Sequence, residues 1–327
     1  MGNRVLRIQS KQVTGLVDDD VEKVNVQVVI VPRGVEKIGA RVFCNCQHLT
    51  SIKLPKTLTS IGAYSFYGCK GLTSLKLPPN LSELYFHAFS SCSGITSVTI
   101  PQSLTQVPSN AFFGCRRISS LTLPDTLTHI GGNAFCGCRS LTSLTIPDSV
   151  SSVGASAFDG CSELISLTLP KKLNAIEFTV FRDCAKLTSI IFPENVTSIG
   201  AMAFKGCDAL ISLKLPKTLT QLGYASFSGC SSITSLALPQ NLTSVGHSAF
   251  GNCTALNYVA FRSCVPRAFI AWVVGNSRNR NNWQVTTLKQ LRNVLRLITA
   301  LALERRDLSS LTPDYKKHLF PGCPFSN

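Results

Sequence analysis

Residues 141–161 read LTSLTIPDSVSSVGASAFDGC, and this stretch is one copy of a unit that fills most of the 327-residue chain. Its last residue belongs to a series in which cysteine recurs every 23 residues. The series consists of Cys46, Cys69, Cys92, Cys115, Cys138, Cys161, Cys184, Cys207, Cys230 and Cys253. Phenylalanine keeps the same step from Phe43 to Phe250, and proline keeps it from Pro32 to Pro239. We call a set of positions that recur every 23 residues a column. Three columns that each keep one residue type through ten cycles without an insertion indicate a repeat protein built by stacking.

Each unit predicts a short strand followed by a turn. The spacing L-x-x-L-x-L places Leu144 and Ile146 on one face of an extended segment, because side chains alternate along a strand. Pro147 then ends the strand, since proline has no N–H to give to a sheet. A second apolar pair follows at Val150 and Val153. The phrase A-F-x-G-C closes the unit, and its glycine allows the backbone to reverse.

No single unit can bury both of its apolar faces, but stacked units can. Neighbouring strands would lie about 4.8 Å apart, and the phenylalanines would form a continuous stack in the core. Counting a degenerate first unit at residues 26–31, we expect eleven strands and a sheet about 50 Å long. Each buried ring would contribute about 1.5–3 kcal/mol.

The phrases L-T-S-L-x-L-P, L-T-S-I-G and A-F-x-G-C resemble those of BspA-like, or treponemal, leucine-rich repeats, over about residues 26–261. The resemblance implies an α/β leucine-rich-repeat solenoid of 23-residue coils. Its parallel β-sheet would form the concave face, with short turns or strands on the convex face. Three parts are expected: an N-terminal cap over 1–25, repeats over 26–263, and a basic helical cap or tail over 264–327. The family implies no single function, since such repeats occur in adhesins, surface proteins and intracellular proteins.

The charge of the chain is unevenly distributed. The net charge is +15, and residues 262–327 hold 11 Lys and Arg against 3 Asp and Glu. A basic segment is typical of proteins that bind nucleic acid, an anionic membrane or an acidic partner. No segment has the length of apolar residues needed to span a membrane, and Arg4 and Arg7 interrupt the region where a secretory signal would be apolar. These features predict an intracellular, cytoplasmic protein.

The 14 cysteines allow three interpretations. Successive members of the cysteine column would stack about 5 Å apart in the core, where free thiols behave as small apolar groups. Disulfides between coils and a metal site are the alternatives. Cys44 and Cys136 stand two residues before column members, a spacing shorter than that of structural zinc loops, and we expect them to face outward at the turn.

The sequence shows no arrangement typical of catalysis. The five histidines, His48, His87, His129, His247 and His318, fall in different columns and do not converge on one coil. A phosphate-binding glycine loop and a nucleophile elbow are both missing. We therefore predict a protein that is not an enzyme, has no cofactor and takes no small-molecule substrate.

Four N-x-S/T sequons begin at Asn80, Asn195, Asn241 and Asn252. Three of them share one column of the repeat, where L-T-S follows automatically. We attribute them to the repeat and not to glycosylation.

The outward positions of the strands are the candidate binding surface. They are Ser51, Lys53, Ser74, Lys76, Ser97, Thr99, Ser120, Thr122, Ser143, Thr145, Ser166, Thr168, Ser212, Lys214 and Tyr258. Small hydroxyls suit crowded strands in any case. They can also recognise a protein or peptide, as the extended faces of solenoids do. The Trp, Tyr and Arg side chains that dominate binding hot spots are sparse in these columns.

The tail is the second candidate. Leu288, Leu291, Leu295, Ile298 and Ala302 follow the three-to-four-residue step of a helix. The polar remainder is basic and includes Lys289, Arg292, Arg296, Arg305 and Arg306. This helix could cap the stack, bind a partner helix, or attach to nucleic acid or an anionic membrane.

The leading hypothesis is a non-catalytic protein–protein interaction scaffold that presents its concave surface to a protein partner. The alternative is electrostatic binding of nucleic acid or an anionic membrane through the basic tail. A surface or adhesion protein is the third hypothesis. The sequence predicts neither the identity of the partner nor the oligomeric state.

Overall fold

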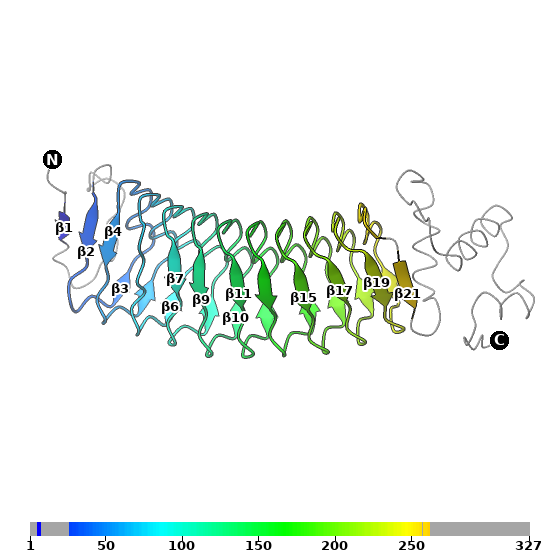
Figure 1. The fold of residues 1–327 in the computed structure, drawn as a ribbon. Coiled ribbons are helices and arrows are strands. Elements are labelled where there is room, and N and C mark those ends of the chain that lie inside the picture. Colours follow the sequence, from blue (N-terminus) through cyan, green and yellow to red (C-terminus); the bar gives the residue numbers. More distant parts are fainter. Residues whose placement is uncertain (1–4, 8–25, 257, 262–327) are drawn as a thin grey trace, which may run out of the picture.

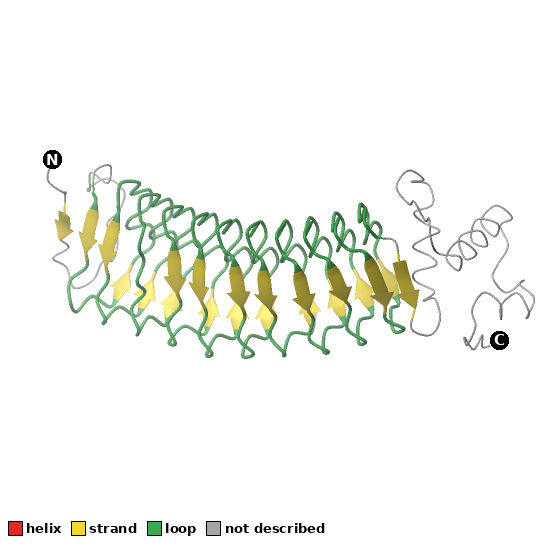
Figure 2. Cartoon of the chain, in the orientation of Figure 1, coloured by secondary structure: helices red, strands yellow, loops and turns green. Residues whose placement is uncertain are grey.

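The computed structural model describes residues 5–7, 26–256 and 258–261. They form an elongated stack of coils that follow one another along a single axis (Figure 1). Most coils contribute one longer strand and one strand of two residues, and the two kinds of strand form separate rows joined by loops (Figure 2). Within the described ranges the secondary structure consists of strands and turns, without helices.

The longer strands are β1 (Val5–Arg7), β2 (Val28–Ile30), β4 (Ser51–Lys53), β7 (Ser97–Thr99), β9 (Ser120–Thr122), β11 (Ser143–Thr145), β13 (Ser166–Thr168), β15 (Ser189–Ile191), β17 (Ser212–Lys214), β19 (Ser235–Leu238) and β21 (Tyr258–Phe261). The two-residue strands are β3 (Lys37–Ile38), β5 (Ser60–Ile61), β6 (Glu83–Leu84), β8 (Gln106–Val107), β10 (His129–Ile130), β12 (Ser152–Val153), β14 (Ala175–Ile176), β16 (Ser198–Ile199), β18 (Gln221–Leu222) and β20 (Ser244–Val245). We call the outward surface of the first row the long-strand face and that of the second row the short-strand face.

All strand pairs are parallel and keep the register of the repeat. Ser143 pairs with Ser166 and Thr145 with Thr168, so that each residue lies beside the one 23 positions later. The short strands pair in the same way, as His129 does with Ser152. The parallel solenoid of 23-residue coils that the sequence predicts is therefore confirmed.

The series of strands differs from the prediction at two coils. The coil of residues 72–77 forms a single bridge between Ser51 and Ser74 instead of a full strand. In the other direction, β1 adds a strand before residue 26, with Val5 paired to Val28 in the same register. The step of 23 residues between these two valines was the signal for this coil. The rest of the predicted N-terminal cap and the predicted helical cap over 264–327 lie outside the described residues.

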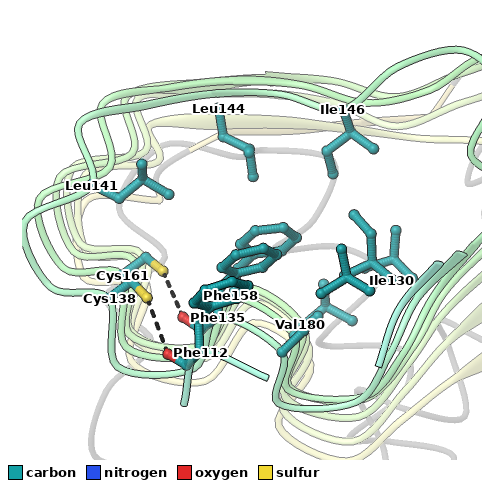
Figure 3. Packing of buried hydrophobic residues seen from close by; sticks show 14 of the residues in the cluster. Phe112, Ile130, Phe135, Cys138, Leu141, Leu144, Ile146, Phe158, Cys161 and Val180 are labelled. Carbon is teal, nitrogen blue, oxygen red and sulfur yellow. Dashed lines mark hydrogen bonds between the residues drawn. The ribbon is translucent and has the colours of Figure 1, made fainter. Parts of the chain in front are cut away.

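The core is organised around the phenylalanine column. From Phe43 to Phe250, consecutive rings stack with centroids 5.1–5.7 Å apart and planes within 17° of parallel. Figure 3 shows this stack between the apolar side chains of the two rows, with Leu144 and Ile146 on one side and Ile130 on the other. The predicted apolar faces are thus buried against each other and against the neighbouring coils.

Two positions in most turns have left-handed backbone geometry. One is the glycine of A-F-x-G-C, such as Gly160 with φ of 70°. The other is held by varied residues, among them Tyr64 at 55° and Thr179 at 54°, for which this conformation costs free energy. At Thr179 the N–H donates to the carbonyl of Ala201 in the next coil, at 2.9 Å. Hydrogen bonds between coils therefore hold a backbone shape that the local sequence does not favour.

The adjacent residues Phe112 and Phe113 provide a matched test of the core, because the first is fully buried and the second is exposed. We expect Phe112→Ala to lower the free energy of unfolding by about 3–5 kcal/mol, through lost burial and the cavity left between two rings. Phe113→Ala should cost about 0.5 kcal/mol or less. Urea denaturation followed by circular dichroism measures both. Equal losses in the two variants would contradict the central role of the phenylalanine stack.

Candidate functional site

The predicted binding residues lie together on the long-strand face. In β7, β11, β13 and β17 the outer two residues are exposed and the middle one is buried. Ser51 is half-buried, and the other candidates from Lys53 to Lys214 are exposed. Tyr258 falls in β21, for which only the backbone is described. The tail candidates Lys289, Arg292, Arg296, Arg305 and Arg306 lie outside the described residues.

The hydroxyls of this face differ from those in the column beside it. In the adjacent column the side-chain hydroxyls donate to backbone carbonyls of the preceding coil at 3.0–3.5 Å. These hydroxyls belong to Thr50, Thr73, Thr96, Ser119 and Thr188. By contrast, the side chains of candidates such as Ser97, Thr99 and Thr145 form no hydrogen bond to any described residue. The first set of hydroxyls is therefore structural, whereas the second set is available to a ligand.

The character of the long-strand face changes along the stack. Lys53 and Lys76 stand near its beginning, and small hydroxyls occupy the middle coils. Further along, Ile191 interrupts the pattern and is 83% exposed, and Ile211, which stands in the adjacent column of Thr50 and Thr188, is 58% exposed. These isoleucines make the later coils more apolar than the middle of the face.

A hollow of about 570 Å³ opens over β17 and β19. It is lined by Ser212, Leu213, Lys214, Leu215, Lys217, Ser235, Ala237, Pro239 and Gln240. Ala237 stands in register with Lys214 and continues the column that holds threonine in the middle coils. Sequence reasoning selected Ser212 and Lys214 but missed the hollow itself. The signal was the change from threonine to alanine in this column.

The cysteine column is part of the core. The described cysteines are free thiols, and the column members from Cys46 to Cys230 are buried. Each column thiol from Cys69 to Cys253 donates to the carbonyl of a phenylalanine 26 residues earlier, at 3.7 Å for Cys138 and 3.6 Å for Cys161 (Figure 3). Burial raises the pKa of the Cys115 thiol to about 12. The prediction of buried free thiols is therefore confirmed, and the bonds join neighbouring coils.

Cys136 is half-buried at the turn, beside an ion pair. Burial, and after it the Asp159 carboxylate, raise its pKa to about 11 against the smaller opposing effect of the Arg182 guanidinium. A nucleophilic cysteine needs a lowered pKa. Cys136 therefore lacks the electrostatic environment of a reactive thiol.

Three ion pairs connect residues 23 positions apart. Arg182 makes two hydrogen bonds to the buried Asp159, at 3.0 and 2.6 Å, while Lys171 meets Asp148 at 2.7 Å and Lys186 meets Glu163 at 2.5 Å. Burial raises the pKa of Asp159, and the Arg182 guanidinium opposes that rise. The pairs of Lys171 and Lys186 are exposed, so they contribute little.

Within the described residues, no group of three or more His, Cys, Asp or Glu side chains is arranged to hold a metal ion. The described histidines stand in separate coils. His87 packs against Tyr64, with ring centroids 4.7 Å apart, and burial lowers its pKa. His318 lies outside the described residues.

An aromatic cluster that sequence reasoning missed forms where the chain leaves β5 and β6. Tyr64 stacks on His87 and meets Phe86 edge-on at 5.5 Å, while Tyr67 lies 5.8 Å from Tyr64. Arg41 lies over the Tyr64 ring at 5.4 Å. Phe86 is 48% exposed. These are residue types common in protein interfaces, but they lie outside the long-strand face.

The sequon asparagines of the shared column have a structural role. Asn80, Asn195 and Asn241 each donate through Nδ2 to a backbone carbonyl of the preceding coil, at 3.0 Å. This contact supports the interpretation that the repeat, and not glycosylation, accounts for them.

Comparisons with known proteins bear on the fold. The BspA type Leucine rich repeat region matches in six copies, over residues 21–142, 105–209 and 128–257. A leucine-rich repeat protein from Bacteroides ovatus is 23% identical with a TM-score of 0.51, over 75% of this chain and 74% of that one. A leucine rich cell surface protein from Faecalibacterium prausnitzii is 25% identical with a TM-score of 0.53, over 80% and 89%. No curated protein matches the sequence.

Alkylation of the native protein tests the assignment of the thiols. At pH values below its pKa of about 11, we expect Cys136 to react with iodoacetamide about tenfold faster for each unit by which the pH rises, since the thiolate is the nucleophile. Buried column members such as Cys115 should stay unmodified until the protein is unfolded in guanidinium. Peptide mass spectrometry at pH 8 and pH 10 measures both. Modification of Cys115 at the rate of Cys136 would refute the buried arrangement.

The Asp159–Arg182 pair gives a pH-dependent prediction. Arg182→Ala leaves a buried carboxylate unpaired and should lower the free energy of unfolding by about 1–3 kcal/mol near pH 7. Without the guanidinium that opposes the rise, the folded-state pKa of Asp159 increases further. A carboxyl group whose pKa is higher in the folded state than in the unfolded state stabilises the fold at pH values below the ordinary aspartate pKa. This contribution is lost as the pH rises through the folded-state pKa. The loss of unfolding free energy caused by Arg182→Ala should therefore be larger at pH 7 than at pH 4.

The control for this experiment is Lys186→Ala, which removes the exposed partner of Glu163. It should cost less than about 1 kcal/mol at either pH. Urea denaturation at the two pH values provides the comparison. If the loss of unfolding free energy in Arg182→Ala were larger at pH 4 than at pH 7, the buried, unpaired Asp159 carboxylate could not be its cause.

Proposed function

The chain belongs to the BspA-type leucine-rich repeat family, and from this premise we propose that it is a non-catalytic scaffold that binds another protein through its long-strand face. Repeats of this family are typical of protein-interaction and surface proteins, and such scaffolds are in general non-catalytic. Solenoids present long faces on which a partner can make contacts over many coils.

The observation that carries the proposal is the difference between the hydroxyl columns. The hydroxyls of Thr96 and Thr188 donate to carbonyls of the preceding coil, whereas the hydroxyls of Thr99 and Thr145 have no hydrogen-bond partner among the described residues. Unpaired hydroxyls at regular spacing can donate to and accept from a polar backbone or side chains. The exposed Ile191 adds apolar contact area on the same face, and the exposed Ile211 adds more in the adjacent column.

Two other candidates have weaker support. Binding of nucleic acid or an anionic membrane rests on the charge of residues 262–327 alone, which lie outside the described part. A surface protein is favoured by the likeness to the Faecalibacterium prausnitzii cell surface protein. The free thiols of the cysteine column favour the predicted intracellular, cytoplasmic location instead.

The described part of the chain contains no helix with the length and hydropathy needed to cross a membrane.

Affinity capture from the lysate of the source organism tests the binding face. The first variant carries Thr99→Arg, Thr122→Arg and Thr145→Arg on the long-strand face. We expect it to retain less than about a tenth of the partner held by the native protein, because three bulky charges replace unpaired hydroxyls at the centre of the contact. Quantitative mass spectrometry of the captured proteins gives the readout.

The control carries Gln106→Arg, His129→Arg and Ser152→Arg, which place the same charges on exposed positions of the short-strand face in the corresponding coils. It should capture the partner as the native protein does. A partner lost equally from both variants, or retained by both, would place recognition elsewhere. Repeating the capture at raised salt separates protein recognition from phosphate binding, which falls steeply.

A further inference from the structure

We propose that the hollow over β17 and β19 is a binding pocket for an acidic, extended peptide segment of a protein partner. This inference rests on the proposed function, whose binding face it shares. It goes further by naming the class of ligand and the side chains that select it. Three features of the hollow carry the inference: its unpaired cations, its shape and its apolar border.

The charges come from Lys214 and Lys217, which both line the hollow. Both are exposed, and neither forms an ion pair with a described residue. Lysines 23 positions after an acid are paired elsewhere in the stack, as Lys171 is with Asp148. Glu194 stands 23 positions before Lys217, yet the structure places no ion pair between them. Two unsatisfied ammonium groups at one hollow favour a carboxylate-bearing ligand.

The shape of the hollow follows from one small side chain. Ile191, Lys214 and Ala237 occupy consecutive positions of one column, in register across β15, β17 and β19. Ala237 does not fill the space that threonine fills in the middle coils, and the hollow opens beside it. Its volume of about 570 Å³ lies within the range typical of ligand pockets. The Ser212 and Ser235 hydroxyls line the same space.

The apolar border distinguishes a peptide from other anions. Ile191 is largely exposed and stands in register with Lys214, and the exposed Ile211 directly precedes Ser212 of the hollow. In an extended chain every second side chain faces the same side, so acidic residues of one segment can face the lysines together while further residues of that segment lie over the isoleucines. Nucleic acid fits this site less well, because none of the nine lining residues is an aromatic platform for a base.

Fluorescence anisotropy with three capped, dye-labelled octapeptides tests the pocket on the full chain. The peptides alternate valine with glutamate, glutamine or lysine. We expect saturable binding of the glutamate peptide with a Kd below about 1 mM, weaker binding of the glutamine peptide, and none of the lysine peptide. Lys214→Glu with Lys217→Glu should weaken the glutamate peptide at least tenfold. Ala237→Thr, which restores the threonine of the column, should weaken it about threefold or more.

The repeat supplies a matched control at the other end of the stack. Lys53 and Lys56 occupy the same two columns as Lys214 and Lys217, but Lys76 stands where the later coil has Ala237. Lys53→Glu with Lys56→Glu should change the affinity less than twofold. Urea midpoints of all variants establish that they are folded.

Several outcomes would overturn the pocket. If the two double lysine variants weakened binding of the glutamate peptide equally, the binding would be general charge attraction. If the glutamate peptide showed no saturable binding, the hollow would not be a peptide site. Tighter binding of an eight-nucleotide oligo-dT probe that depends on Lys214 and Lys217 would replace the peptide with nucleic acid. The scaffold function fails separately, because its test alters Thr99, Thr122 and Thr145, which do not line the hollow.

Discussion

The stacking of one phenylalanine ring on the next is the interaction on which the rest of this structure depends. Each coil is too thin to bury its own apolar residues, so Phe135 is covered by Phe112 on one side and Phe158 on the other. The thiol of Cys161 adds a bond to the carbonyl of Phe135, which ties the turn of one coil to the ring-bearing turn of the coil before. An insertion anywhere in a coil would move its ring out of the stack. This constraint accounts for the unbroken step of 23 residues and leaves the outward positions free to vary.

The same register determines the electrostatics. Two residues 23 apart in sequence lie side by side in neighbouring coils, and the ion pairs of Asp148, Asp159 and Glu163 all use this offset. Charges on the surface are therefore paired mainly across neighbouring coils, although Arg182 also lies 3.7 Å from its sequence neighbour Asp183. Lys214 and Lys217 are among the cations that have no carboxylate partner in the described part of the chain, although Glu194 stands 23 positions before Lys217. A solenoid can thus place an unbalanced charge at one coil without disturbing the others.

The features that could be predicted from the sequence are those that recur in every coil. The columns of Cys161 and Phe158 identify the coil, its strands and its buried thiols, because one residue type recurs wherever the packing environment recurs. The coil of β1 escaped prediction because Val5 lacks the phenylalanine, proline and cysteine that mark the later coils. The second left-handed column escaped for another reason: residues as different as Tyr64 and Thr179 adopt it, so backbone geometry repeats there without any repeat of residue type. The hydroxyl columns could be found from spacing and the small residue at Ala237 could be seen in its column, but the hollow also depends on how the side chains of β17 and β19 are placed around it, which only a structure displays.

On a surface made of small hydroxyls, the binding free energy comes from many weak contacts and not from a few strong ones. Large aromatic anchors can give high affinity from a few residues, and the aromatic cluster around Tyr64 has that character. The long-strand face has no such anchor in its middle coils, so a partner must align with several coils before many weak contacts add up. The hollow supplies what such a face lacks, namely one place where charge, shape and apolar contact coincide. If a partner first engages the hollow, the regular hydroxyls can then select the alignment of the rest of its chain. On this view the even spacing of the coils is itself the basis of specificity, because only a partner whose polar groups follow the same spacing can satisfy consecutive coils.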